Sequence, residues 1–168
     1  MKIRKAEISD AEAIMKINID TWQQAYKGII PAEILAQRRC SPERAENWRK
    51  NIKKTISGSS AVYVAEDNSG NVIGFVWGGL SRDREIPRHL ELYAFYVHPK
   101  AQKNGYGKAL FEAFRKYAAG KFYLYALQEN INAEGFYKKM GGVLMPEYTK
   151  DSPCAGGKPL KESCYFFE

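Results

Sequence analysis

The sequence contains few of the residues that hold metal ions or disulfide frameworks. It has three cysteines, Cys40, Cys154 and Cys164, and only two histidines, and no two cysteines have the C-x-x-C spacing of a zinc or redox site. Three widely spaced cysteines also cannot form a complete set of disulfide pairs. We therefore expect no metal site and reduced cysteines, with Cys154 as the one candidate for exposure.

Long apolar runs are also missing. No stretch of 18 apolar residues occurs, and the first ten residues, MKIRKAEISD, lack the apolar segment of a signal peptide. These features predict a cytoplasmic protein with no membrane partner.

Acidic residues are outnumbered, 19 against 26 lysines and arginines, for a formal net charge of +7. Such an excess suits a nucleic acid, an anionic surface or a polyanionic small ligand. The basic residues are spread along the chain, with short clusters only at Arg38-Arg39 and Lys53-Lys54, which is typical of a solvated surface. No nucleic-acid recognition motif accompanies them. We predict no nucleic-acid partner and keep such a binding module as the third hypothesis.

The composition is that of one globular domain covering residues 1–168, with 45% apolar and 13% aromatic residues. Alternating and periodic patterns predict strands over 2–8, 60–66, 72–80, 91–97, 122–127, 143–148 and 163–167. They predict helices over about 10–21, 32–37, 42–54, 106–120 and 132–140, with loops over 81–89 and 149–161. This order of elements indicates an α/β or mixed α+β fold, a sheet flanked by helices.

The stretch from residue 91 to 120 is the most informative. Its strand places Glu91, Tyr93, Phe95 and Val97 on one face, opposite Leu92, Ala94 and Tyr96. A loop over 102–107 and a helix beginning at about residue 106 follow. The inward face of this helix is expected to hold Tyr106, Ala109, Leu110, Ala113, Phe114 and Tyr117.

The loop has the chemistry of an anion site. Gly105 and Gly107 remove the Cβ atoms that would keep a bulky anion from the backbone, and the helix that follows presents unpaired N–H groups. Lys103 and Lys108 add positive charge. Neither a G-x-x-x-x-G-K-[ST] loop nor a G-x-G-x-x-G fingerprint is present, because Leu110 stands at the third glycine position. A tight turn without any ligand is the alternative.

Two segments together resemble a known family. The run Phe95-Tyr96-Val97-His98-Pro99, followed by Gln102-x-x-Gly105-x-Gly107 and a helix, resembles the acetyl-CoA-binding segment of the GCN5-related N-acetyltransferase (GNAT) superfamily. Downstream, Asn130-x-x-Ala133-x-x-Phe136-Tyr137-Lys138-Lys139-Met140-Gly141 resembles its second conserved segment. The resemblance covers about residues 1–148 in element order. Gln102, in place of an arginine, and Gly142, in place of a phenylalanine, depart from the family pattern.

The resemblance implies a central mixed, mostly antiparallel sheet flanked by helices, and transfer of an acetyl group from acetyl-CoA to an amine of a small molecule, peptide or protein. It implies Tyr137 as general acid and Glu91 as general base, with Trp22 and Tyr26 in the acceptor wall. The implied cofactor-binding residues are Phe95, Tyr96, Val97, Gln102, Lys103, Asn104, Gly105, Tyr106, Gly107, Lys108 and Asn130.

Structural alternatives stand beside these roles. Glu91 can be a strand-entry carboxylate that touches water or pairs with an arginine, and Tyr137 a core tyrosine. Trp22 and Tyr26, four residues apart, can pack one helix face into the core. The whole chain can also be a non-catalytic acyl-CoA-binding or regulatory domain. The acceptor and the oligomeric state, with a homodimer among the candidates, are left open.

Overall fold

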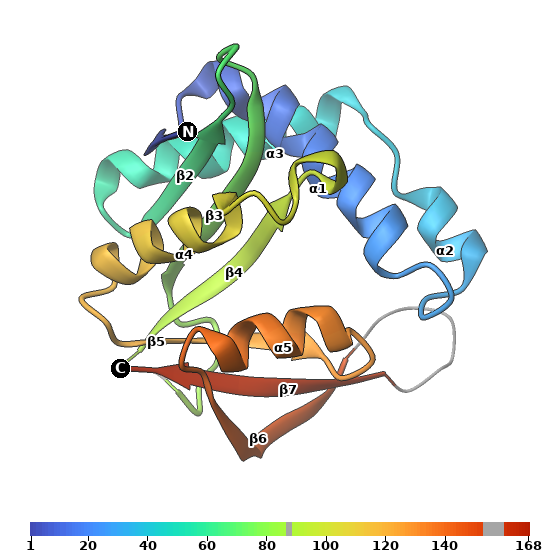
Figure 1. Ribbon diagram of the computed structural model, residues 1–168, viewed down its shortest axis with the longest axis vertical. Coiled ribbons are helices and arrows are strands. Elements are labelled where there is room, and N and C mark those ends of the chain that lie inside the picture. Colours follow the sequence, from blue (N-terminus) through green and yellow to red (C-terminus); the bar gives the residue numbers. More distant parts are fainter. Residues whose placement is uncertain (87–88, 153–159) are drawn as a thin grey trace.

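A computed structural model describes residues 1–86, 89–152 and 160–168. Its seven strands form one sheet in the order β1-β2-β3-β4-β5-β7-β6 (Figure 1). The strands are β1 (Lys2–Lys5), β2 (Ser60–Glu66), β3 (Val72–Leu80), β4 (Leu90–Val97), β5 (Phe122–Leu127), β6 (Val143–Ser152) and β7 (Leu160–Phe167). Only β4 and β5 pair in parallel, and all other neighbours are antiparallel. The predicted mixed, mostly antiparallel sheet is confirmed.

Helices cover both faces of the sheet. They are α1 (Ala11–Ala25), α2 (Ala32–Gln37), α3 (Pro42–Lys54), α4 (Tyr106–Tyr117) and α5 (Ile131–Lys139). Figure 1 shows α4 and α5 in front of the sheet and α1 and α3 behind it. Ser41 begins α3 as its N-cap, accepting a hydrogen bond from the Arg44 amide at 3.2 Å. No helix in the described part of the chain has the length and hydrophobicity to cross a membrane.

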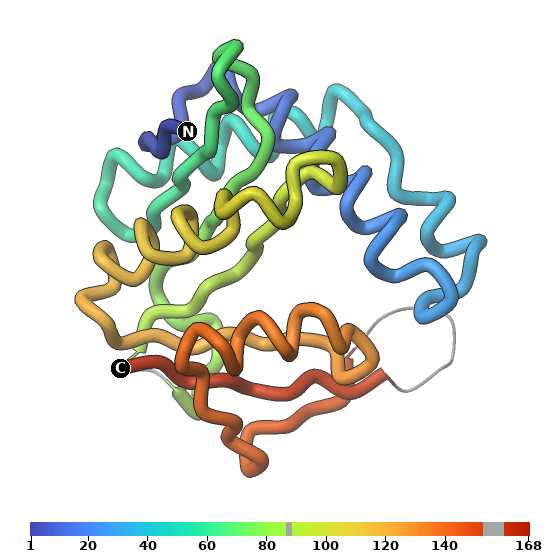
Figure 2. Tube along the Cα trace, viewed as in Figure 1, coloured from blue at the N-terminus to red at the C-terminus, as the bar shows by residue number. Residues whose placement is uncertain are grey.

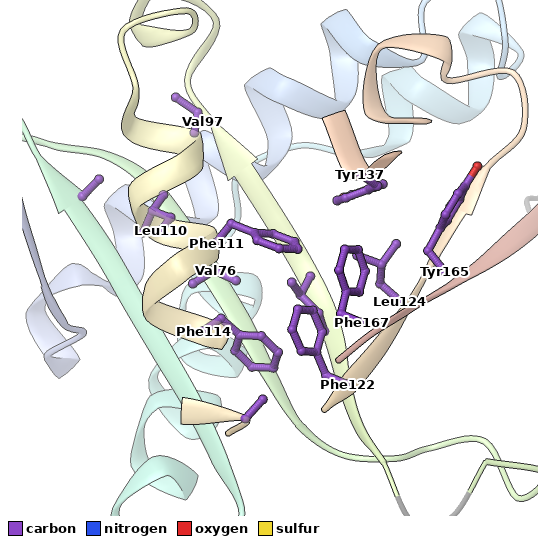
Figure 3. Close-up of a cluster of buried hydrophobic side chains, with 13 residues drawn as sticks. Val76, Val97, Leu110, Phe111, Phe114, Phe122, Leu124, Tyr137, Tyr165 and Phe167 are labelled. Carbon is purple, nitrogen blue, oxygen red and sulfur yellow. The ribbon is translucent and has the colours of Figure 1, made fainter. Parts of the chain in front are cut away.

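An aromatic core lies between α4 and the sheet (Figure 3). The Phe122 and Phe167 rings stack with centroids 4.7 Å apart, and Phe111 and Phe114 of α4 pack against Phe122. The predicted inward face of α4 included Leu110 and Phe114 but omitted Phe111, which is 0% exposed. Tyr106, Ala109, Ala113 and Tyr117 are only half-buried. The buried stripe is shifted because α4 also packs against α5, where Phe136 meets Phe111 edge-on.

A β-bulge changes the faces of β4. Trp77 of β3 opposes Ala94, whereas the next residue, Gly78, opposes Leu92, so Tyr93 has no partner on β3. As a result Leu92, Phe95 and Val97 join the core beneath α4, while Ala94 and Tyr96 pack toward α1. The predicted regular alternation, with Glu91 and Tyr93 on the face of Phe95 and Val97, is therefore wrong, because the extra residue reverses the pattern.

The C-terminal strands are longer than the sequence predicted. Residues 149–152 belong to β6 and residues 160–161 to β7, with Ser152 opposite Leu160. The predicted 149–161 loop is thus wrong at both ends, because ladder pairing extends the hairpin. Its middle, residues 153–159, and with it the predicted exposure of Cys154, lie outside the described residues. Cys154 is not the one candidate for exposure, because Cys40 is exposed.

The Phe114 ring leaves no room for a side chain at residue 78. An added Cβ on Gly78 would overlap this ring and lie 2.5 Å from the Glu91 carbonyl oxygen. We expect Gly78→Ala to lower the free energy of unfolding by about 1–3 kcal/mol through overpacking. As a matched control, Gly135→Ala on α5 meets nothing within 4 Å and should be neutral or stabilising. Urea denaturation of both variants measures this, and equal stabilities would contradict the packing argument.

Candidate active site

The parting of β4 and β5 opens a cavity in the middle of the sheet. The two strands pair only at Leu90–Phe122, Glu91–Tyr123 and Leu92–Leu124. Beyond these pairs they diverge, as the chain traces in Figures 1 and 2 show. A cavity of about 890 Å³ occupies the opening, lined by β4, β5, the C-terminal part of α1, the 102–108 loop and α5.

One wall of this cavity is a free strand edge. Phe95 and Val97 point their backbone N–H groups away from β3, and no strand lies on that side, because the pairs with β5 end at Leu92. Backbone N–H and C=O groups on such an edge need partners, and an extended ligand can supply them as an added strand does. Phe95, Tyr96 and Val97 all line the cavity, and their contact with a cofactor stays a prediction.

The N-terminus of α4 forms the second wall. Gly105 is its N-cap with φ +83°, and the Ala109 amide makes the first intrahelical bond, to the Gly105 carbonyl, at 3.1 Å. The amides of residues 106–108 precede that bond, so the helix supplies unpaired donors and a positive dipole end. Lys103, Gly105, Gly107 and Lys108 all line the cavity there. This arrangement can hold a phosphate or diphosphate.

The side chains of Gln102 and Asn104 hold the 102–108 loop in place. The Gln102 side chain lines the cavity and donates to the Val97 carbonyl at 3.1 Å, which ties the loop to β4. Asn104 donates to the Gln102 carbonyl at 3.1 Å. Neither Asn104 nor Tyr106 is among the described lining residues. Their side chains therefore shape the loop and do not reach into the cavity.

Helix α5 brings Asn130 and Tyr137 to the cavity. Asn130 is the N-cap, and its Oδ1 accepts from the Ala133 amide at 3.2 Å. Tyr137 is 8% exposed and packs 6.3 Å from Phe111 between ring centroids. Burial, followed by the proximity of Tyr96, raises the pKa of the Tyr137 phenol, so it stays protonated at neutral pH. Tyr137 is thus a packed core residue that also lines the cavity and carries a protonated hydroxyl.

Trp22 and Tyr26 take different places. Tyr26 and Tyr96 line the cavity, whereas Trp22 lies behind them. The Trp22 indole donates from Nε1 to the Tyr96 hydroxyl at 2.9 Å and packs 4.5 Å from the Tyr26 ring. Trp22 is not among the described lining residues, so its predicted place in the acceptor wall stays a prediction. Trp22 orients the tyrosine that faces the cavity.

Glu91 is held away from the cavity. It is 5% exposed and is not among the lining residues. Its carboxylate accepts from the Arg82 amide at 2.9 Å, from the Arg82 guanidinium at 3.1 Å and from the Tyr123 hydroxyl at 3.2 Å. This is the arginine pairing considered as the structural alternative. The geometry does not support Glu91 as a direct base, because its lone pairs already have partners.

The sequence did not point to Tyr125 or Tyr93, which also line the cavity. The Tyr125 hydroxyl donates to Asp83 at 2.6 Å. Burial and this bond raise the pKa of Tyr125, while the same bond, with the Glu85 amide and Lys150, lowers the pKa of Asp83. Both tyrosines looked like ordinary strand residues. Tyr93 and Tyr125 line the cavity because β4 and β5 separate beside them, and no local sequence pattern marks the point of separation.

Comparisons with known proteins agree with this geometry. The N-acetyltransferase YuaI of Bacillus subtilis, itself uncharacterized, is 28% identical over 132 residues, which cover 76% of this chain and 72% of the relative. The spermidine N(1)-acetyltransferase of Thermoplasma acidophilum is 23% identical over 145 residues, covering 84% and 87%.

A solved structure shares the fold. The crystal structure of the PaiA N-acetyltransferase from T. acidophilum, in complex with coenzyme A, superimposes with a TM-score of 0.75 at 22% identity and covers 96% of both chains. A sequence model of the acetyltransferase (GNAT) family matches residues 16–142, a span that includes both motifs. This chain belongs to the GNAT family of acetyltransferases.

Proposed function

We propose that this chain is an N-acetyltransferase that moves an acetyl group from acetyl-CoA to an amine of a small molecule, peptide or protein. One observation carries the proposal: a single cavity joins the helix N-terminus of α4, the free edge of β4 and the buried hydroxyl of Tyr137. These are an anion site, a backbone template and a proton donor, the three features that a thioester-to-amine transfer needs.

The residues present fit coenzyme A. The amides of residues 106–108, with Lys103 and Lys108, match its diphosphate in charge and hydrogen bonding. The free edge at Phe95 and Val97 matches the amide-bearing pantetheine arm, and Asn130 adds a polar contact from α5. When bound, acetyl-CoA supplies the activated acetyl group.

The chain's own groups account for the rest of the chemistry. The backbone N–H of Val97, which points away from β3 at the edge of β4, polarises the acetyl carbonyl. As the new C–N bond forms and the C–S bond breaks, Tyr137 donates its proton to the departing sulfur. No carboxylate is among the described lining residues. The amine therefore reacts in its neutral form and loses its proton through water, and Glu91 holds Arg82 in place.

Gly107→Val tests the backbone cradle. An added Cβ would lie 3.6 Å from Phe95 and 3.7 Å from Phe136, which are ordinary contact distances, and thermal melting checks that the two further methyl groups of valine leave the chain folded. We expect coenzyme A affinity, measured by calorimetry, to fall about tenfold or more because the side chain blocks close approach of the anion. Gly135→Val on α5, outside the cavity, is the matched control. Unchanged affinity in Gly107→Val would mean that the loop is only a turn.

Tyr137→Phe tests the proton donor. We expect the turnover number to fall about tenfold or more while coenzyme A affinity stays within about twofold, because only the hydroxyl is removed. Thiol release across a panel of polyamines, aminoglycosides, amino acids and peptides measures turnover. An unaltered rate would remove Tyr137 from the mechanism. Coenzyme A binding without thiol release from any amine would favour the non-catalytic acyl-CoA-binding alternative.

The pH dependence follows from the raised pKa of Tyr137. Below this pKa the phenol keeps its proton, so the acid is available throughout the range in which the acceptor amine, with a pKa of roughly 10, becomes neutral. We expect kcat/KM to rise from pH 6 to about pH 9.5 with no descending limb. Stopped-flow thiol detection checks this. A fall beginning near pH 8 would show that a different acid protonates the sulfur.

A further inference from the structure

The gap between β4 and β5 opens on two faces of the sheet. The face toward α4 holds the proposed cofactor groups, because an added Cβ on Gly107 would lie 3.6 Å from Phe95 there and Tyr137 packs in the core beneath α4. In the proposed reaction the sulfur leaves on this face, where Tyr137 protonates it. Coenzyme A would thus occupy the α4 face, and the amine has to enter from the opposite one, here named the acceptor face.

Four tyrosines line the cavity at the acceptor face. Tyr93 packs edge-on against Trp77 with ring centroids 4.9 Å apart, and Tyr96 packs toward α1. Tyr125 points away from the α4 face, because its neighbours in β5 belong to the core beneath α4. The fourth ring, that of Tyr26, comes from the C-terminal end of α1. Four aromatic side chains from three elements therefore surround the place where an acceptor would bind.

The hydroxyl groups of three of these tyrosines are bonded to the chain. Tyr93 donates to the last carbonyl group of β3, and Tyr125 donates to Asp83 at 2.6 Å. The Tyr96 hydroxyl accepts from Trp22 Nε1 at 2.9 Å. These bonds hold the rings in fixed orientations and engage their polar ends. The ring carbons are then the surface that remains for a ligand, and this surface is rigid and apolar.

The acceptor face also lacks charge. The charged residues among the described lining residues all come from α4, the loop before it and α5, which lie on the α4 face (Figure 1). Burial raises the pKa of Tyr26, Tyr93 and Tyr125, so these phenols are neutral and offer an ammonium no phenolate. Residues with small side chains lie beside the rings in the same wall and leave space between them: Ala25, Ala94 and Ala126.

We infer that the acceptor is an arylalkylamine, a primary amine on a short alkyl arm that ends in a planar aromatic group. Fixed tyrosine rings with small residues between them form a slot in which another ring makes edge-to-face or offset stacked contacts. A polyamine would instead bring a second charge to a wall in which no described lining residue is a carboxylate. The inference rests on the proposed acetyltransferase function and names the class of its acceptor.

The experiment compares two amines with the same carbon skeleton. Phenethylamine and cyclohexylethylamine differ only in the aromaticity of the ring, and thiol release from acetyl-CoA gives kcat/KM for each. The values are expressed per concentration of neutral amine, so that a difference in amine pKa does not enter their ratio. We expect the wild-type chain to favour phenethylamine about fivefold or more, because a puckered ring cannot make the aromatic contacts. Cadaverine, a linear diamine, should be poorer than phenethylamine by about tenfold or more.

Variants of Tyr125 separate the ring from its hydroxyl. In Tyr125→Leu the ring is lost, and we expect the phenyl-to-cyclohexyl ratio to fall about threefold or more. Tyr125→Phe keeps the ring without the bond to Asp83 and should retain the preference. Tyr117→Leu on α4, outside the described lining residues, is the matched control and should keep the wild-type ratio. Tyr93→Leu repeats the test at a second ring. Thermal melting accompanies the kinetics, because a general loss of fold lowers both rates together and leaves their ratio unchanged.

Equal kcat/KM for the phenyl and cyclohexyl amines would overturn the assignment while leaving the acetyltransferase intact. So would a ratio unchanged in both Tyr125→Leu and Tyr93→Leu, or an equal fall in Tyr117→Leu. A preference for cadaverine would also overturn it, by showing that the rings bind a cation. If no amine of the wider panel releases thiol from acetyl-CoA, the proposed function fails and the assignment fails with it.

Discussion

The separation of β4 from β5 after Leu92 is the constraint on which the site depends. Three parallel pairs hold the strands together at one end, and then each strand follows its other neighbour, β3 for β4 and β7 for β5. The bulge at Tyr93 comes directly after the last parallel pair, and a bulge increases the local twist of a strand. The gap exposes backbone groups inside the molecule, which is unfavourable unless a ligand pairs with them.

The bulge has a second consequence, for the side chains. By reversing the alternation it sends Phe95 and Val97 toward α4 and Tyr96 toward α1. The backbone N–H groups of Phe95 and Val97 are left at the open edge of β4 while the side chains anchor the strand from both sides. The Trp22–Tyr96 hydrogen bond fixes the α1 side and the Phe95–Phe136 contact the α5 side. A rigid strand edge of this kind suits precise placement of a bound acyl group.

Charge is distributed differently on the two sides of the gap. Near the N-terminus of α4, Lys103 and Lys108 have no carboxylate partner among the described residues, so their charge is available to an anion. Near β3 and β6, Arg82 and Lys150 are already paired with Glu91 and Asp83. Part of the net charge of +7 is therefore concentrated at the loop before α4, where it can attract an anion.

The sequence by itself determined the fold class, the start of α4 and the glycine-bearing loop before it, because these depend on local signals: glycines at 105 and 107, an amphipathic period and alternating strands. It also predicted the helix that carries Tyr137, with Asn130 shortly before its start. Only the tertiary structure decided that Tyr93 is bulged, that Arg82 captures Glu91 and that Trp22 lies behind Tyr96. These outcomes depend on register and on contacts between residues distant in sequence, such as Trp22 and Tyr96, and no local pattern encodes them.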